Sequence, residues 1–144
     1  IMRYMLYESN DSKVTLAKEI TYLKSFIELQ KLRFKDNAYV VLEVEGQVTQ
    51  QQIVPLLLIS FVENAFKHGL ATDKENPIYI NISVFEDNLL FTVKNKKSLN
   101  NKDQTGGIGM NNVVRRLDLT YPDKYKLSVE NREHEYFSEL YLNL

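Results

Sequence analysis

Hydrophobic and polar residues along this chain follow two periods, one typical of helices and one typical of strands. Apolar residues at helical spacing predict helices over about 16–34, 56–68 and 110–119, and alternation predicts strands over 39–45, 78–85, 89–93, 125–131 and 135–144. Thr15 is a candidate N-cap for the first helix, and the strands around 86–88 form a predicted β-hairpin. This order of elements predicts a two-layer α/β (α+β) sandwich, in which helices cover one face of a mixed β-sheet.

The second predicted helix is nearly apolar but carries one narrow polar stripe. The stripe consists of residues at positions i, i+3, i+4, i+7 and i+8, which share one helical face: Ser60, Glu63, Asn64, Lys67 and His68. Burying such groups without partners costs roughly 1–3 kcal/mol each, so something polar should lie over them. A metal ion together with a phosphate would satisfy a carboxylate, an amide, an amine and an imidazole. The alternative is a solvated face on which lysine and glutamate occur by chance.

These residue types suit magnesium and phosphate. Mg²⁺ prefers oxygen ligands and keeps several waters, so the amide oxygen of Asn64 is a suitable single protein ligand. Lys67 can place a positive charge on a phosphate, and Glu63 could act as a base or orient a nucleophile. Pro55 is expected near the first turn of this helix, and Gly69 at the C′ position just after it.

A glycine cluster, Gly106-Gly107-Ile108-Gly109, precedes the third predicted helix. Glycines at the start of a helix let backbone N–H groups approach a phosphate closely, although an ordinary loop would also account for them. The cluster matches neither a dinucleotide-binding fingerprint nor a Walker A loop. Arg115 and Arg116, in the helix that follows, could reach phosphate, but pairing with nearby acids is the favoured interpretation. The stripe and the glycine cluster together indicate a phosphate site more specifically than either does alone.

Composition narrows the range of functions. The 144 residues suffice for one domain with a sizeable core, and a net charge of −1 gives no electrostatic case for binding nucleic acid. The absence of cysteine excludes a disulfide framework and zinc bound by cysteine. The longest apolar run, 53–61, is far shorter than the roughly 20 residues that a membrane-spanning helix needs. Residues 1–12 have the pattern of a helix end followed by a polar turn, so we expect the chain to be part of something longer.

The motifs resemble those of one protein family. Pro55-Leu-Leu-Leu with Val62-Glu-Asn-Ala-Phe-Lys-His-Gly69 resembles the N box of LytS-type sensor histidine kinases. The stretch 107–122, which begins Gly-Ile-Gly-Met-Asn-Asn, resembles their second glycine box and the helix after it. Residues 19–34 resemble the helix that opens the same catalytic domain, so the resemblance covers essentially residues 13–144.

This resemblance implies the Bergerat-type ATP-binding fold shared by gyrase, Hsp90, histidine kinases and MutL. It implies that Asn64 holds Mg²⁺, that Glu63 lies near the transferred phosphate, and that Lys67 and His68 contact phosphates. It further implies a lid over 95–106 and a phosphate cradle formed by Gly107, Ile108, Gly109, Met110 and Asn112. Many relatives carry an Asp-x-Gly box whose carboxylate accepts the adenine amino group. Here Asn95 stands in that place. Its amide oxygen can accept a hydrogen bond from the adenine amino group, but without charge assistance. The alternative is that Asn95 simply starts a turn at the end of the strand.

The resemblance also implies a function and partners. We expect the catalytic domain of a two-component sensor histidine kinase, which passes the γ-phosphoryl group of Mg·ATP to a histidine on an upstream segment, and from there to an aspartate in the receiver domain of a response regulator. Residues 1–12 would be the tail of that upstream dimerisation helix, in a homodimer anchored to a membrane with this domain in the cytoplasm. Two alternatives stay open, namely a degenerate nucleotide-binding or partner-docking module and a stand-alone ATPase in which Glu63 activates water.

Overall fold

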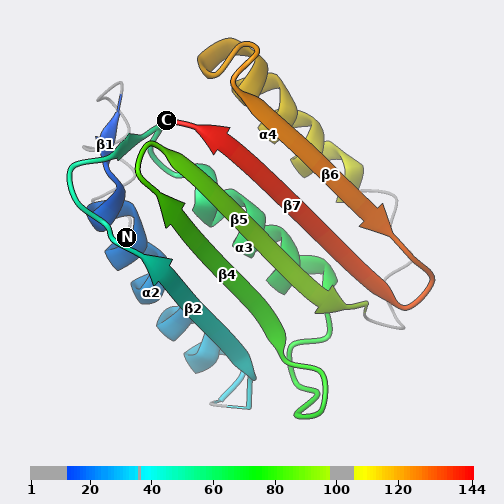
Figure 1. Ribbon diagram of the computed structural model, residues 1–144. Helices are drawn as coiled ribbons and strands as arrows, with labels where there is room; N and C mark the ends of the chain where they lie inside the picture. The colour runs from blue at the N-terminus through cyan, green and yellow to red at the C-terminus, as the bar shows by residue number, and fades with distance from the viewer. Residues whose placement is uncertain (1–12, 36, 98–105) are drawn as a thin grey trace.

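A five-stranded mixed β-sheet forms one layer of the molecule, and three helices cover one of its faces (Figure 1). The computed structural model describes residues 13–35, 37–97 and 106–144, with 106–109 described by their backbone alone. The described helices are α2 (Leu16–Arg33), α3 (Leu57–His68) and α4 (Gly106–Thr120). The strands are β1 (Val14–Thr15), β2 (Val40–Gly46), β3 (Gln52–Ile53), β4 (Ile78–Phe85), β5 (Asn88–Lys96), β6 (Tyr125–Asn131) and β7 (Glu135–Asn143). The predicted two-layer sandwich is confirmed.

The strands lie in the order β2-β4-β5-β7-β6. β2 pairs with β4 in parallel, and the other neighbours are antiparallel. The parallel pair requires a crossover, and α3 lies within it, as is usual for a β-α-β connection. β4 and β5 form the predicted hairpin, with the turn at Glu86 and Asp87, where Glu86 has a positive φ of 54°.

The core lies between the sheet and the helices. Alternate residues of the central strands point into it, and these are Ile78, Ile80, Ile82 and Val84 of β4 and Leu89, Phe91 and Val93 of β5. The ring of Phe61 on α3 meets that of Phe91 edge to face, with centroids 5.6 Å apart. Since burying one such side chain contributes about 1.5–3 kcal/mol, this packing fixes α3 firmly on the sheet.

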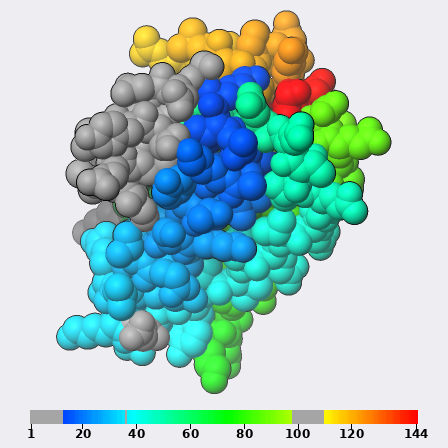
Figure 2. Space-filling view, turned by 90° about the vertical axis from the view of Figure 1, so that its left-hand side faces the viewer, coloured from blue at the N-terminus to red at the C-terminus, as the bar shows by residue number. Residues whose placement is uncertain are grey.

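A short ladder joins the start of α2 to the segment that leads into α3, and the sequence did not predict it. Val14 and Thr15 of β1 pair with Ile53 and Gln52 of β3, and the backbone N–H of Leu16 donates to the carbonyl of Gln51 at 2.8 Å. In the space-filling view the start of α2 lies beside this segment (Figure 2). The predicted cap of α2 is confirmed, because the backbone N–H of Lys18 donates to Oγ1 of Thr15 at 3.2 Å.

The start of α4 and the end of β5 differ from the predicted boundaries. α4 begins at Gly106, so the glycine cluster lies in the first turn of the helix rather than before it. Near its end Tyr121 is buried and Leu119 is 74% exposed, so the tyrosine completes the apolar face. β5 continues to Lys96, because Asn95 and Lys96 pair with β7, so the predicted lid cannot begin at Asn95.

The predicted helix tail over 1–12 and the rest of the lid, 98–105, lie outside the described residues. Among the described residues, no helix is long and apolar enough to cross a membrane.

Candidate functional site

The polar stripe lies on the face of α3 that the sheet leaves uncovered. The helix buries its apolar residues, which are Leu57, Leu58, Ile59, Phe61, Val62, Ala65 and Phe66. Glu63 and Lys67 are exposed, and Ser60, Asn64 and His68 are half-buried. The structure therefore confirms that these five residues share one face, as the helical period predicted.

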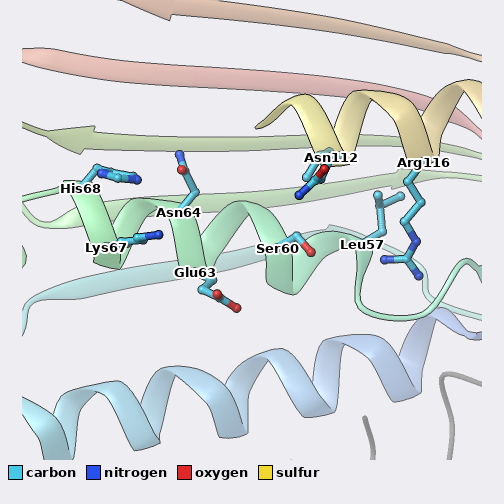
Figure 3. Close-up of a pocket in the computed structure, with 9 residues that line it drawn as sticks. Leu57, Ser60, Glu63, Asn64, Lys67, His68, Asn112 and Arg116 are labelled. Carbon is cyan, nitrogen blue, oxygen red and sulfur yellow. The ribbon is translucent and has the colours of Figure 1, made fainter. Parts of the chain in front are cut away.

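A cavity of about 280 Å³ lies between α3 and α4, and all five stripe residues line it (Figure 3). α4 contributes Asn112, Val113 and Arg116 to the opposite wall. In Figure 3 His68 and Asn64 lie toward one end of the cavity, and Arg116 lies at the other end beside Leu57. The stripe thus faces, across a single cavity, the helix that the glycine cluster begins.

The charges around this cavity favour an anionic ligand. Lys67 and Arg116 bring two permanent cations to its walls, and Glu63 is the one carboxylate among the lining residues. The Glu63 side chain points away from Asn64, toward α2 (Figure 3). No group of three or more His, Cys, Asp or Glu residues that could hold a metal occurs within the described ranges. The amide oxygen of Asn64, which lines the cavity, could be a single protein ligand for a metal that takes its other ligands from phosphate and water, as Mg²⁺ commonly does.

The backbone of the glycine cluster begins the helix whose Asn112 lines the cavity. Gly107, Ile108 and Gly109 lie in the first turn of α4, where the N–H groups of a helix have no partner within the helix. Such groups, at the positive end of the helix dipole, bind phosphate readily. Met110 is only 8% exposed, so its side chain belongs to the core and the backbone alone is available to a ligand. Asn112 is exposed and lines the cavity.

Asn95 does not line the α3–α4 cavity. It is 2% exposed and projects from β5 on the face that the helices cover, in line with Phe91 and Val93. Its side-chain Nδ2 donates to the carbonyl of Lys96 at 3.3 Å. The alternative that Asn95 starts a turn is wrong, because it pairs with Tyr136 within the sheet.

Asn95 instead lies against Gly69, the residue that follows α3. Gly69 has extended backbone (φ −90°, ψ 166°) rather than the left-handed conformation typical of the C′ position. Glycine is needed there for space, because an added Cβ would lie 2.3 Å from the carbonyl oxygen of Ala65 and 2.7 Å from Nδ2 of Asn95.

Sequence reasoning missed one residue that shapes the site. Glu19 of α2 is 0% exposed, and its carboxylate oxygens accept the backbone N–H groups of Leu56 and Leu58, each at 3.1 Å. For Arg116 the sequence suggested either contact with phosphate or pairing with nearby acids. In the structure its guanidinium donates to the backbone carbonyl of Pro55. A signal was present in the sequence, because Glu19 interrupts the apolar face of α2 and no capping side chain precedes α3.

Solved structures of histidine kinase catalytic domains share this fold. The nucleotide-free catalytic domain of histidine kinase ThkA covers 91% of this chain and 93% of its own, with a TM-score of 0.64 and 16% sequence identity. The histidine kinase domain of a blue-light activated kinase from Erythrobacter litoralis covers 93% of this chain and 69% of its own, with a TM-score of 0.59 and 13% identity. At these identities the likeness shows the fold alone.

Sequence comparisons define the class further. A family model described as histidine kinase matches residues 1–38. Sensor histidine kinase BtsS of Escherichia coli is 30% identical over 118 residues, which make up 81% of this chain and 21% of BtsS. Sensor protein LytS of Oceanobacillus iheyensis is 26% identical over an alignment 148 residues long, which covers 92% of this chain and 25% of LytS.

These matches confirm the resemblance seen in the motifs. The chain is a homologue of sensor histidine kinases, LytS among them, and it has the fold of their catalytic domains. It spans only about a fifth to a quarter of the length of these curated relatives.

Proposed function

We propose that this chain is the ATP-binding catalytic domain of a two-component sensor histidine kinase. It binds Mg·ATP between α3 and α4 and passes the γ-phosphoryl group to a histidine on a segment upstream of residue 13. The observation that carries the proposal is the shared cavity, whose walls include Asn64 and Lys67 from α3 and Asn112 and Arg116 from α4. A metal ligand, two cations and a helix N-terminus form a set of groups suited to a triphosphate.

The residues of α3 and α4 divide the work of binding. The amide oxygen of Asn64 holds Mg²⁺, which neutralises charge on the phosphate oxygens when it is bound. Lys67 and His68 contact phosphates from α3, while the backbone N–H groups of residues 107–110 cradle them from α4. Asn112 adds a side-chain amide to the same wall. Phosphoryl transfer requires mainly positioning and charge neutralisation, and this arrangement supplies both.

Glu63 serves the incoming acceptor rather than the metal. Its exposed carboxylate points toward α2, away from Asn64, although both residues line the same cavity. In that position it can orient the acceptor imidazole or take its proton as the phosphoryl group is transferred.

Asn95 recognises the adenine amino group through its amide oxygen. Support for this role comes from its contact with Gly69. Gly69 directly follows His68, which lines one end of the α3–α4 cavity. An amide oxygen accepts a neutral hydrogen bond, which is about half as strong as the charge-assisted bond of an aspartate. We therefore propose weak nucleotide binding, with a dissociation constant in the micromolar to millimolar range, or roughly −4 to −8 kcal/mol.

The upstream and downstream partners follow from the same proposal. Residues 1–12 are the end of the dimerisation helix that carries the acceptor histidine, and the whole protein is a membrane-anchored homodimer with this domain in the cytoplasm. A response regulator receiver domain takes the phosphoryl group from the histidine. In support, histidine kinase ThkA has been solved in complex with response regulator protein TrrA. The alignment with that kinase covers 98% of this chain and 45% of the kinase chain, at a TM-score of 0.58 and 14% identity.

Isothermal titration calorimetry of the chain with a non-hydrolysable ATP analogue and Mg²⁺ tests the proposal. Heat of binding that depends on Mg²⁺ is the expected result. Asn95 in place of the aspartate of the Asp-x-Gly box favours a second candidate function, a degenerate nucleotide-binding or partner-docking module. The absence of both binding heat and NMR shift changes, at up to several millimolar nucleotide, would establish this second function. A stand-alone ATPase is distinguished by mixing the chain with its upstream segment and labelled ATP, because a kinase labels that segment whereas an ATPase releases phosphate alone.

A further inference from the structure

The start of α3 lacks the features that normally stabilise a helix N-terminus. Leu56, at the N-cap position, has a left-handed backbone (φ 67°, ψ 7°) and provides no side-chain cap. No acidic residue lies in the first turn. The first N–H groups of a helix need partners from elsewhere, and an apolar residue at the N-cap cannot supply one.

Glu19 supplies these partners from a different helix. One oxygen of its carboxylate accepts the N–H of Leu56 and the other accepts the N–H of Leu58, both at 3.1 Å. Burial of a carboxylate with 0% exposure is costly in free energy, but charge-assisted bonds at the positive end of a helix offset that cost. Glu19 is therefore an N-cap for α3 that reaches across from α2.

α4 and Tyr121, which directly follows it, hold the same segment from the other side. The guanidinium of Arg116 donates to the carbonyl of Pro55, and the hydroxyl of Tyr121 accepts the N–H of Val54 at 3.1 Å. Tyr121 is itself 1% exposed, and the ammonium of Lys13 lies 5.3 Å from the centroid of its ring. Residues 54–58, which lead into α3 and form its first turn, are thus held by polar contacts from α2, α4 and Tyr121.

We propose that Glu19 is a positioning residue for the α3–α4 site, which fixes where α3 begins and therefore where Asn64 and Lys67 lie. The inference rests on the proposed function, since it gives Glu19 a role in Mg·ATP binding. Asn64 is six residues beyond Leu58, or about 9 Å along the same helix, so a rotation of α3 at its cap also moves the metal ligand. α2 is also the first described helix after residue 13, so this carboxylate links the beginning of the domain to the phosphate site.

Glu19→Gln is the sharpest change, because glutamine keeps the shape of the side chain but has only one acceptor oxygen. Its NH₂ group would face one of the two N–H groups, which leaves that donor unpaired in a buried place. Glu28→Gln is the matched control, since Glu28 lies on the same helix, is 72% exposed and pairs with Lys31. Glu19→Asp retains the charge and loses reach, and it replaces the glutamine variant if that variant does not fold.

Two measurements on the chain test the proposal. In amide NMR spectra without ligand, Glu19→Gln should shift the backbone amides of Leu56 and Leu58, and also the backbone amides of Asn64 and Lys67 and the side-chain amide of Asn64. Glu28→Gln should shift none of them. In calorimetry, the ratio of ATP-analogue affinity with Mg²⁺ to that without it should fall about tenfold or more in Glu19→Gln, because misplacing a ligand by about 1 Å is expensive.

The outcomes separate the possibilities. A variant that is less stable but keeps wild-type shifts at Asn64 and the wild-type Mg²⁺ ratio would overturn the proposal and leave Glu19 a purely structural residue. Wild-type protein that binds no nucleotide, while shifts in Glu19→Gln still spread to Asn64, would refute the proposed function and retain Glu19 as the group that positions α3.

Discussion

Asn95 of β5 and Gly69 at the end of α3 lie in direct contact, so that no side chain fits between them. A Cβ on Gly69 would lie 2.7 Å from Nδ2 of Asn95 and 2.3 Å from the carbonyl oxygen of Ala65. The proposed adenine contact and the end of α3 are therefore fixed relative to one another by van der Waals contact.

Replacing Gly69 by alanine should destabilise the fold by about 1–3 kcal/mol, because the new methyl group overpacks a site bounded partly by backbone. Urea unfolding measures this change. The double variant with Asn95→Ala should recover part of the loss, and no recovery would mean that the carbonyl of Ala65 alone sets the limit. Unchanged stability in the single variant would contradict the contact.

Replacing Asn64 by alanine should abolish the Mg²⁺-dependent part of nucleotide binding and leave the melting temperature unchanged or slightly higher. The side chain is half-buried and lines the cavity, and alanine is the better helix former. Calorimetry with and without Mg²⁺ measures the first effect and thermal unfolding the second. Asn143→Ala, at an exposed position on β7, is the control. An Asn64→Ala variant with the wild-type response to Mg²⁺ would rule out the metal assignment.

Asn95→Asp should raise affinity for ATP several-fold, which corresponds to about 1 kcal/mol, because the bond to the adenine amino group becomes charge-assisted. The same change should lower the melting temperature of the free protein, since a carboxylate cannot donate to the carbonyl of Lys96 and is buried there. Titration with ATP and with GTP distinguishes the effects. Equal affinity for both nucleotides in both variants would remove Asn95 from base recognition.

Tyr121 should make the protein less stable at alkaline pH. Burial raises the pKa of Tyr121 above its ordinary value of 10.0, and Glu19 adds to the effect, while Val54 and Arg116 partly oppose it. Above about pH 10 the unfolded chain releases this proton and the folded chain retains it, so the free energy of unfolding falls as pH rises.

Tyr121→Phe should remove this part of the pH dependence and cost about 1 kcal/mol at neutral pH, because the N–H of Val54 loses its acceptor. Urea unfolding at pH 8 and pH 10.5 measures both effects, and Tyr79→Phe, on the exposed face of the sheet, is the control. An unchanged difference in stability between the two pH values would exclude Tyr121 as a source of the slope.

The chain by itself should not become phosphorylated on histidine. It contains two histidines, and His68 is fixed in the wall of the proposed phosphate site. The other, His134, is 70% exposed in the turn between β6 and β7, beside the carboxylate of Glu133 at 3.7 Å, which would repel a nucleotide. Incubation with radiolabelled ATP should leave the chain unlabelled until the upstream segment is added. Acid-labile label on the chain alone would contradict the proposed transfer to a separate segment.

The sequence predicted the features of this fold that depend on neighbouring residues. The stripe on α3 and the β4–β5 hairpin follow from spacing over a few residues, so the pattern contains what is needed to predict them. The cap of α3 cannot be predicted from spacing over a few residues, because Glu19 is 37 residues from Leu56 and acts through tertiary contact. The extension of β5 to Lys96 was missed for a similar reason, since its polar end is held by pairing with β7 rather than by its own alternation.

The order of the strands has a consequence for how the protein folds during synthesis. β7 is the last strand in the chain, yet it lies between β5 and β6 inside the sheet. β6 is made earlier but has no strand to join until residues 135–143 have left the ribosome. The amino-terminal part, with β2, β4, β5 and α3, can associate before that point, whereas the edge strand must wait. A nascent chain that pauses before β7 would leave the edge of β5 unpaired and open to association with other chains.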